Sequence, residues 1–170
     1  MAINSELFND DFLAASLRKL ADNDDAIGLR SLLSSGYSVN HRFENGMRPL
    51  HFASRKGALK LIRAMLEAGA IVEAPVNQAR GSFTPLHSAV RSGNVDAVRL
   101  LIEYGAKTFS GTDRCGTTPL EYAKELEQHE IASVLLDEMS RTIKLYQSLM
   151  EELQPVNTTN RPKTTPELRH

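Results

Sequence analysis

The chain has 170 residues, of which 41% are hydrophobic and 24% are charged, and its formal net charge is −1. These values are ordinary for one soluble domain with or without a tail, and they give no global signal for nucleic-acid or membrane binding. Tryptophan is absent and aromatic residues make up 6% of the chain, which favours a fold that buries many small aliphatic side chains.

The single cysteine and the absence of targeting signals indicate a compartment. Cys115 has no second cysteine to pair with, so an intramolecular disulfide is impossible, which fits a reducing environment. The start, MAINSELFNDD, lacks the basic and apolar regions of a secretory signal. No apolar run approaches the roughly 20 residues that span a bilayer. We therefore expect a cytoplasmic or nuclear protein.

The first element expected along the chain is a degenerate repeat at about residues 10–42. Its recognisable part is the segment SLLSSGY at residues 31–37. Two Asp-Asp pairs, at residues 10–11 and 24–25, lie near predicted helix starts, where carboxylates complement the helix dipole. We expect these carboxylates to support helices, because nothing points to a shared pocket for a general acid and base.

Three similar phrases follow: RPLHFA at 48–53, TPLHSA at 84–89 and TPLEYA at 118–123. Their prolines are spaced by 36 and 34 residues, and a leucine-containing segment follows each phrase. A fixed period of this size indicates stacked repeats, none of which buries its apolar side alone. The chain therefore contains about four units of 33–36 residues, and the first and last are degenerate, as terminal units with a polar outer face should be.

The third unit shows how each repeat is expected to fold. Thr84 is a good N-cap, Pro85 suits the first helical position, and Gly93 suits a left-handed C-cap. A second helix is predicted from about Asn94, with apolar residues at helical spacing, and it closes at Gly105. The fourth unit follows the same plan but departs from it at three positions, Glu121, Glu127 and Met139, where the other units have a histidine and two glycines.

These phrases resemble the ankyrin repeat family, whose hallmark is a G-x-T-P-L-H-x-A phrase, a glycine at the helix–helix turn and a Leu-Leu…Gly-Ala close in roughly 33 residues. The resemblance covers about residues 10–139. It implies an all-α ankyrin-repeat solenoid of helix–turn–helix pairs with projecting loops or β-hairpins, plus a C-terminal helix. The repeats then lie at about residues 10–42, 46–79, 81–113 and 116–139.

Two histidines, His51 and His87, occupy the same place in the second and third repeats. Histidine titrates near neutral pH, so a catalytic or metal-binding role is one hypothesis. The alternative is that each imidazole lies at the start of its helix and hydrogen-bonds locally, tying neighbouring loops together, as the family resemblance implies. We favour the structural role, because the other histidines, His41, His129 and His170, form no zinc-type cluster with a cysteine.

The sequence predicts no catalytic, cofactor-binding or metal site. The phosphate-binding patterns GxxxxGK[ST] and GxGxxG are absent, and so is the GxSxG pattern of serine hydrolases. We therefore do not expect an enzyme.

The family resemblance implies that a partner lies across the loops before each Pro-Leu phrase and across the ends of the first helices. Five side chains at these positions form a predicted basic stripe: Arg55, Lys56, Arg80, Arg91 and Arg114. Met47 and Phe83 lie beside it, and arginine and aromatic residues are common hot spots of interfaces. The hypothesis is a protein or peptide partner with acidic residues flanking an apolar anchor. The alternative is a solvated surface that happens to be basic. The predicted partner-binding residues are Met47, Arg55, Lys56, Arg80, Phe83, Arg91, Ser92, Arg114 and Thr117.

The loop between the second and third repeats is longer than the others. It has 15 residues from Gly69 to Thr84, against 12 and 13 in the equivalent connections. Insertions are tolerated in surface loops and often carry function. We expect the segment IVEAPVNQARGSF to contact a partner specifically, and neutral variation is the alternative.

The chain ends with a predicted helix at residues 140–154 and a tail. Ile143, Tyr146, Leu149, Met150 and Leu153 have helical spacing, and Pro155 ends the helix. We expect this helix to cap the last repeat, and self-association or partner binding is the alternative. Residues 155–170 are polar and rich in Pro and Thr, so we expect disorder there.

The function expected from the resemblance is a non-catalytic protein–protein interaction module, an adaptor or scaffold that binds on its concave loop and helix surface. A regulatory inhibitor of a partner enzyme is an alternative. A nucleic-acid binder that uses the basic stripe is a further alternative, which steep salt dependence would reveal.

Overall fold

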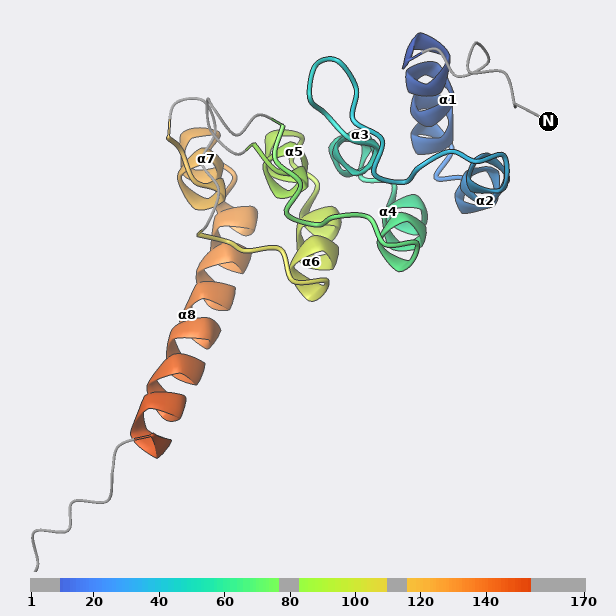
Figure 1. Cartoon of the computed structure of the whole chain (residues 1–170). Helices are drawn as coiled ribbons and strands as arrows, with labels where there is room; N and C mark the ends of the chain where they lie inside the picture. The colour runs from blue at the N-terminus through green and yellow to red at the C-terminus, as the bar shows by residue number, and fades with distance from the viewer. Residues whose placement is uncertain (1–9, 77–82, 110–115, 154–170) are drawn as a thin grey trace, which may run out of the picture. The chain divides into compact units, whose positions relative to one another are not determined.

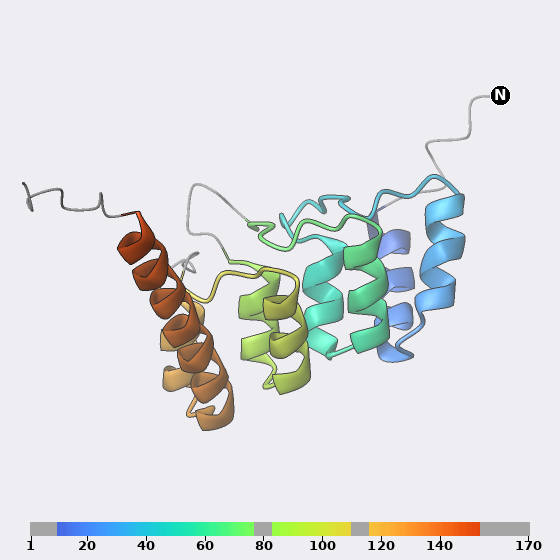
Figure 2. The same cartoon turned by 90° about the horizontal axis from the view of Figure 1, so that it is seen from below.

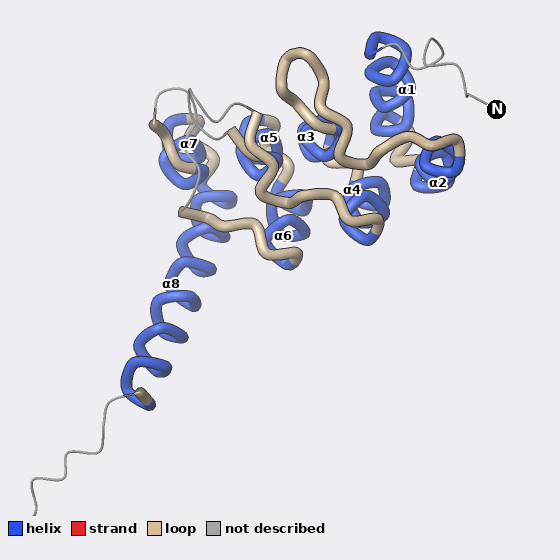
Figure 3. Tube along the Cα trace, in the orientation of Figure 1, coloured by secondary structure: helices blue, strands red, loops and turns tan. Residues whose placement is uncertain are grey.

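The structure is a computed structural model, and it describes residues 10–76, 83–109 and 116–153. Within these ranges it contains eight α-helices and no strands, joined by turns and loops (Figure 3). The helices are α1 (Asp10–Asp22), α2 (Ala26–Ser34), α3 (Pro49–Lys56), α4 (Leu59–Glu67), α5 (Pro85–Arg91), α6 (Val95–Glu103), α7 (Pro119–Glu125) and α8 (His129–Glu152).

The chain divides into two compact units, residues 1–139 and residues 140–170, and helix α8 begins in the first unit and ends in the second. In the first unit, α1, α3, α5 and α7 lie side by side and form a first row (Figures 1 and 2). Helices α2, α4 and α6 form a second row beneath it, followed by the first turns of α8. Helix α3 contacts α1 and α5, and α4 contacts α2 and α6, so each helix pair stacks on its neighbours.

The residues that begin and end the helices follow the predicted repeat plan. The N-caps of α5 and α7, Thr84 and Thr118, have extended backbones and precede a proline at the first helical position. Gly57 and Gly93, between the two helices of their repeats, have φ values of 68° and 72°. This left-handed conformation costs glycine little, because glycine has no Cβ.

The terminal repeats keep the same backbone shape without the glycine. Asp24 and Glu127 are the described non-glycine residues with positive φ, at 50° and 56°, and both lie in the turn between the two helices of their repeat. The loss of glycine at Glu127 therefore leaves the turn unchanged and places a side chain in a conformation that L-residues rarely adopt. Asp24 has a use there, because its Oδ1 accepts a hydrogen bond from the Leu61 backbone N–H at 2.9 Å.

The core is built from aliphatic side chains, as the composition predicts. Leu17, Leu50, Leu61, Leu86 and Leu101 are among the largest fully buried side chains, which run through all the helix pairs of the first unit. Stacking of repeats thus buries apolar surface that no isolated helix pair covers.

Polar side chains link the loops of successive repeats at an equivalent position, four residues after the closing glycine. Asn40 accepts a hydrogen bond from the Ile71 backbone N–H at 2.9 Å and donates to the Gly69 carbonyl at 2.8 Å. Glu73 accepts from the Lys107 backbone N–H at 3.0 Å. Each closing turn is therefore held to the next one along the stack.

The C-terminal unit contains the second half of α8. The helix ends at Glu152, and the Leu153 N–H still donates to the Leu149 carbonyl at 3.0 Å, which agrees with the predicted helix. Six large apolar side chains of this segment are exposed: Ile143, Leu145, Tyr146, Leu149, Met150 and Leu153. The expectation that this helix caps the last repeat stays a prediction. Residues 155–170, the predicted tail, lie outside the described residues.

We expect Glu127→Gly to stabilise the protein by about 1 kcal/mol, because glycine removes the cost of a left-handed L-residue. Glu125→Gly is the matched control: it removes the same side chain at the end of α7, where glycine should destabilise the helix by about 1 kcal/mol. Urea denaturation followed by circular dichroism measures both changes. Equal destabilisation by the two variants would contradict the assignment of strain to Glu127.

Candidate functional site

His51 is fully buried and joins two repeats. It is the third residue of α3, and its Nδ1 accepts a hydrogen bond from the Arg48 backbone N–H at 3.1 Å. Its Nε2 lies 3.3 Å from the Phe83 carbonyl oxygen, to which it donates. One ring nitrogen therefore caps the helix of its own repeat, and the other holds the loop of the following repeat.

His87 repeats this arrangement one unit later. Its Nδ1 accepts from the Thr84 backbone N–H at 3.1 Å and lies 3.0 Å from the Thr84 hydroxyl. Its Nε2 lies 3.3 Å from the Thr117 carbonyl oxygen. The prediction that these histidines tie neighbouring loops together is confirmed, and the hydrogen bonds leave no ring nitrogen of either residue facing an open pocket.

Glu121 occupies the position of the histidine in the last repeat. In the described residues it caps its own helix, as His51 and His87 do, but holds no following loop. Its carboxylate accepts hydrogen bonds from the Thr118 backbone N–H and hydroxyl, both at 2.8 Å. The bond from the Thr118 backbone is the main reason that the pKa of Glu121 lies below its ordinary value. An ionised carboxylate has no proton to donate to a following loop, which suits a repeat after which the described stack ends.

The environment of His51 keeps its imidazole neutral. Burial lowers the pKa of His51 to about 4, because a buried cation loses its hydration, and the hydrogen bonds to backbone only partly offset this effect. Nδ1 accepts a hydrogen bond from the Arg48 backbone N–H, so a proton on Nδ1 would face that N–H and break the bond. His51 is therefore not poised to exchange protons near neutral pH, as a general acid or base would be.

The predicted basic stripe is only partly placed by the described residues. Arg55 and Arg91 are exposed and hold the same position, the seventh residue, in α3 and α5. The Arg55 guanidinium lies over the Phe52 ring, 5.7 Å from its centroid. Lys56 forms an ion pair with Asp22 at the end of α1, so its charge is partly balanced within the protein. Arg80 and Arg114 lie outside the described residues.

Four other predicted contact residues have structural contacts of their own. Met47 is half-buried and packs against the core. The half-buried Phe83 ring lies 5.2 Å from the His87 ring, and the Thr117 carbonyl accepts the bond from His87. The Ser92 hydroxyl donates to the Ser88 and Ala89 carbonyls at the end of α5. Residues 77–82 of the predicted longer loop lie outside the described residues.

Sequence reasoning missed a hollow beside α1. It has a volume of about 210 Å³ and is lined by residues of α1, of the loop that follows α2 and of α3: Asp10, Asp11, Ala14, Arg18, Phe43, Glu44, Asn45 and Phe52. Asp10 accepts from the Glu44 N–H at 3.3 Å and lies 2.8 Å from His41 Nε2. No sequence signal pairs Asp10 with His41, because their contact arises only when α1 stacks against the following loop.

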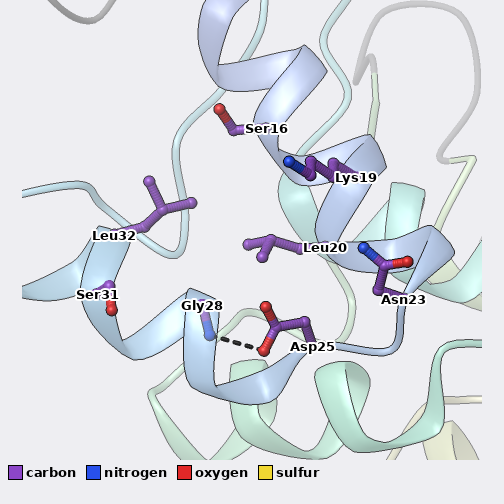
Figure 4. A pocket seen from close by; sticks show the side chains of 8 residues that line it. All are labelled: Ser16, Lys19, Leu20, Asn23, Asp25, Gly28, Ser31 and Leu32. Atoms are coloured by element: carbon purple, nitrogen blue, oxygen red, sulfur yellow. Dashed lines mark hydrogen bonds between the residues drawn. The ribbon is translucent and has the colours of Figure 1, made fainter.

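A larger hollow, of about 370 Å³, lies between α1 and α2 (Figure 4). Leu20 and Leu32 supply its apolar lining, together with Ser16, Lys19, Asn23 and Ser31. The Asp25 carboxylate at its edge accepts hydrogen bonds from Ile27 and Gly28 and so caps α2. This use of the carboxylate is structural, and the hollow lies apart from the predicted contact residues.

Comparison with models of known protein families identifies the family of this chain. The family model described as ankyrin repeats, in three copies, matches residues 13–111 and 73–147. The chain belongs to the ankyrin repeat family. The prediction of an all-α ankyrin-repeat solenoid is thereby confirmed, and the helix order described above agrees with it. Ankyrin repeats are generally protein–protein interaction modules and are typically non-catalytic. A search of curated proteins found no match.

Two further observations concern other classes of site. Among the residues that the structure describes, no group of three His, Cys, Asp or Glu side chains is placed to hold a metal ion. No helix in the same residues is long and apolar enough to cross a membrane.

We expect the stability of the ankyrin domain to fall as the pH drops below 6.5, because unfolded His51 has the ordinary pKa of 6.5 and folded His51 about 4. As the pH falls, the unfolded state takes up a proton before the folded state does. The stabilisation that neutral His51 gives the folded state is therefore complete above pH 6.5 and is lost by pH 4, a change of about 3 kcal/mol in the free energy of unfolding. Denaturation of the wild type and of His51→Gln between these pH values tests this. The variant should be less stable at pH 7 but lose less on acidification; parallel pH profiles would contradict the assignment.

Proposed function

We propose that this ankyrin-repeat protein is a non-catalytic adaptor or scaffold whose first-row helices bind an acidic protein or peptide segment. The observation that carries the proposal is the pair formed by Arg55 and Arg91. These side chains are exposed at the same position of two helices that pack on each other. Exposed arginines presented at a fixed spacing form bidentate hydrogen bonds with carboxylates, and such residues dominate many interfaces.

The spacing of the two arginines limits what the partner presents. Packed helices lie about 8–10 Å apart, so α3 and α5 hold the bases of Arg55 and Arg91 at roughly that distance. An extended chain rises about 3.3 Å per residue. A partner segment with two carboxylates about three residues apart therefore matches the pair.

Contacts inside the protein support Arg55 over Lys56 as a binding residue. The Phe52 ring beneath the Arg55 guanidinium limits its freedom, so that less conformational entropy is lost on binding. Lys56 would have to break its ion pair with Asp22 before it met a partner. The proposed contact set is therefore centred on Arg55 and Arg91, with Ser92 beside Arg91, with Met47, Phe83 and Thr117 before the helix starts, and with Arg80 and Arg114 as additional candidates in the loops.

A cytoplasmic or nuclear location belongs to the same proposal. It is supported by the single cysteine, which cannot form an intramolecular disulfide.

Charge reversal at both arginines, Arg55→Glu with Arg91→Glu, should reduce capture of a bound protein from cell extract at least about tenfold, because carboxylates would then face carboxylates. The matched control is Arg63→Glu with Arg99→Glu. Arg63 and Arg99 are exposed at equivalent positions of α4 and α6 in the second row, so the control makes the same charge change at the same repeat spacing. It should leave capture unchanged.

A defined probe separates this proposal from its alternatives. A fluorescent peptide with two glutamates three residues apart and a leucine between them should bind the wild type and lose affinity with the first-row variant only. Equal binding by wild type and both variants would overturn the proposal. Binding of single-stranded or double-stranded nucleic acid, with steep salt dependence, would instead favour a nucleic-acid binder.

A further inference from the structure

The second half of α8, residues 140–153, presents an apolar face to solvent. Ile143, Tyr146, Leu149, Met150 and Leu153 have exposed fractions between 44% and 75%. An exposed apolar group of this size on one helix is uncommon on a soluble protein and usually marks a contact surface. None of these side chains belongs to the core of the first unit.

Four of the residues have the spacing of a coiled-coil seam. Ile143, Tyr146, Met150 and Leu153 follow one another at intervals of three, four and three residues, so they occupy successive a and d positions of a heptad. Leu149 lies beside this seam. A stripe of this kind is completed by a second helix that offers the same pattern.

The seam is symmetric about Ser148. In an antiparallel pair of identical helices centred there, Ile143 of one copy meets Leu153 of the other, and Tyr146 meets Met150. The outer layers then pair two aliphatic side chains, and the inner layers pair a thioether with an aromatic ring, which is a favourable contact. A two-fold axis requires this kind of self-complementarity of one surface patch.

The charges of the segment favour the same orientation. Arg141 and Lys144 lie in its first half, and Glu151 and Glu152 lie at its end. An antiparallel pair places the basic half of each copy against the acidic half of the other, whereas a parallel pair places like charges together. These charged side chains lie on the outer side of the helix around Ser148, so they act on the orientation only at long range and at low salt.

We propose that residues 140–153 pair with the same segment of a second copy of this chain, in antiparallel order, so that the protein forms a weak homodimer through α8. The seam is short, with about three helical turns in each copy, which places it among small, transient interfaces. A dimer also carries two copies of the proposed arginine surface, so a partner with two acidic segments would gain affinity through multivalency.

Sedimentation equilibrium of the full chain from about 5 to about 500 µM tests the proposal. The mass of the wild type should rise from the 18.8 kDa of the monomer towards twice that value with concentration. Met150→Glu places a charge inside the seam and should weaken association at least about tenfold. Ser148→Glu is the matched control, because it places the same charge on the same stretch of helix but on the opposite face, and it should associate like the wild type.

The orientation has its own test. In the antiparallel pair Tyr146 of one copy meets Met150 of the other, so adding Tyr146→Lys to Met150→Glu should restore part of the association that Met150→Glu removes, since in a parallel pair Tyr146 would meet Tyr146 and like charges would face each other. Circular dichroism should show equal helix content and melting temperature of the first unit for all variants, because these side chains are exposed.

A wild type that stays monomeric over the whole concentration range would overturn the proposal. So would a Met150→Glu protein that associates like the wild type, which would place the contact elsewhere. Failure of this test leaves the proposed partner-binding function unaffected, because Arg55 and Arg91 lie in the first unit and are measured by capture.

Discussion

The stack depends on one neutral imidazole hydrogen-bonding in two directions at once. Nδ1 of His51 accepts the backbone N–H of the residue before its helix, and Nε2 donates to a carbonyl of the following loop. Neutral imidazole combines one acceptor and one donor on opposite sides of a rigid ring, which carboxylate, ammonium and hydroxyl groups do not. The distance between a helix start and the next loop is therefore fixed by the width of that ring.

This bond determines where the binding residues lie. The carbonyls that receive the imidazole bonds belong to Phe83 and Thr117, which immediately precede the next Thr-Pro pairs. Holding those residues fixes the start of the following first-row helix, and with it the register of Arg55 and Arg91 at the helix ends. A recognition surface built this way is ordered before binding, so that its partner meets little entropic cost.

The ends of the stack depart from the repeat plan in ways that follow from the same physics. Where no further described repeat accepts a donor, Glu121 replaces histidine and keeps the capping bond alone. Asp24 and Glu127 keep the left-handed turn, and Asp24 adds a bond to the next repeat. The terminal repeats of the described stack therefore lose the histidine or the glycine but keep the left-handed backbone that the turn requires.

The sequence by itself determined the period, the helix limits of the two central repeats and the structural role of the two histidines, because these depend on local backbone rules: a proline at the first helical position, a cap before it and a left-handed residue between helices. It did not show that the second helix of the last repeat and the predicted C-terminal helix are one continuous helix, α8. Only the tertiary structure decided that Lys56 is paired with Asp22, that Asp10 meets His41, and that the apolar face of the last helix is exposed. Periodicity assigns a residue to a face of its own helix but says nothing about which distant side chain lies opposite. That depends on the register in which whole helix pairs stack and on the reach of individual side chains, and both are settled only when the repeats come together.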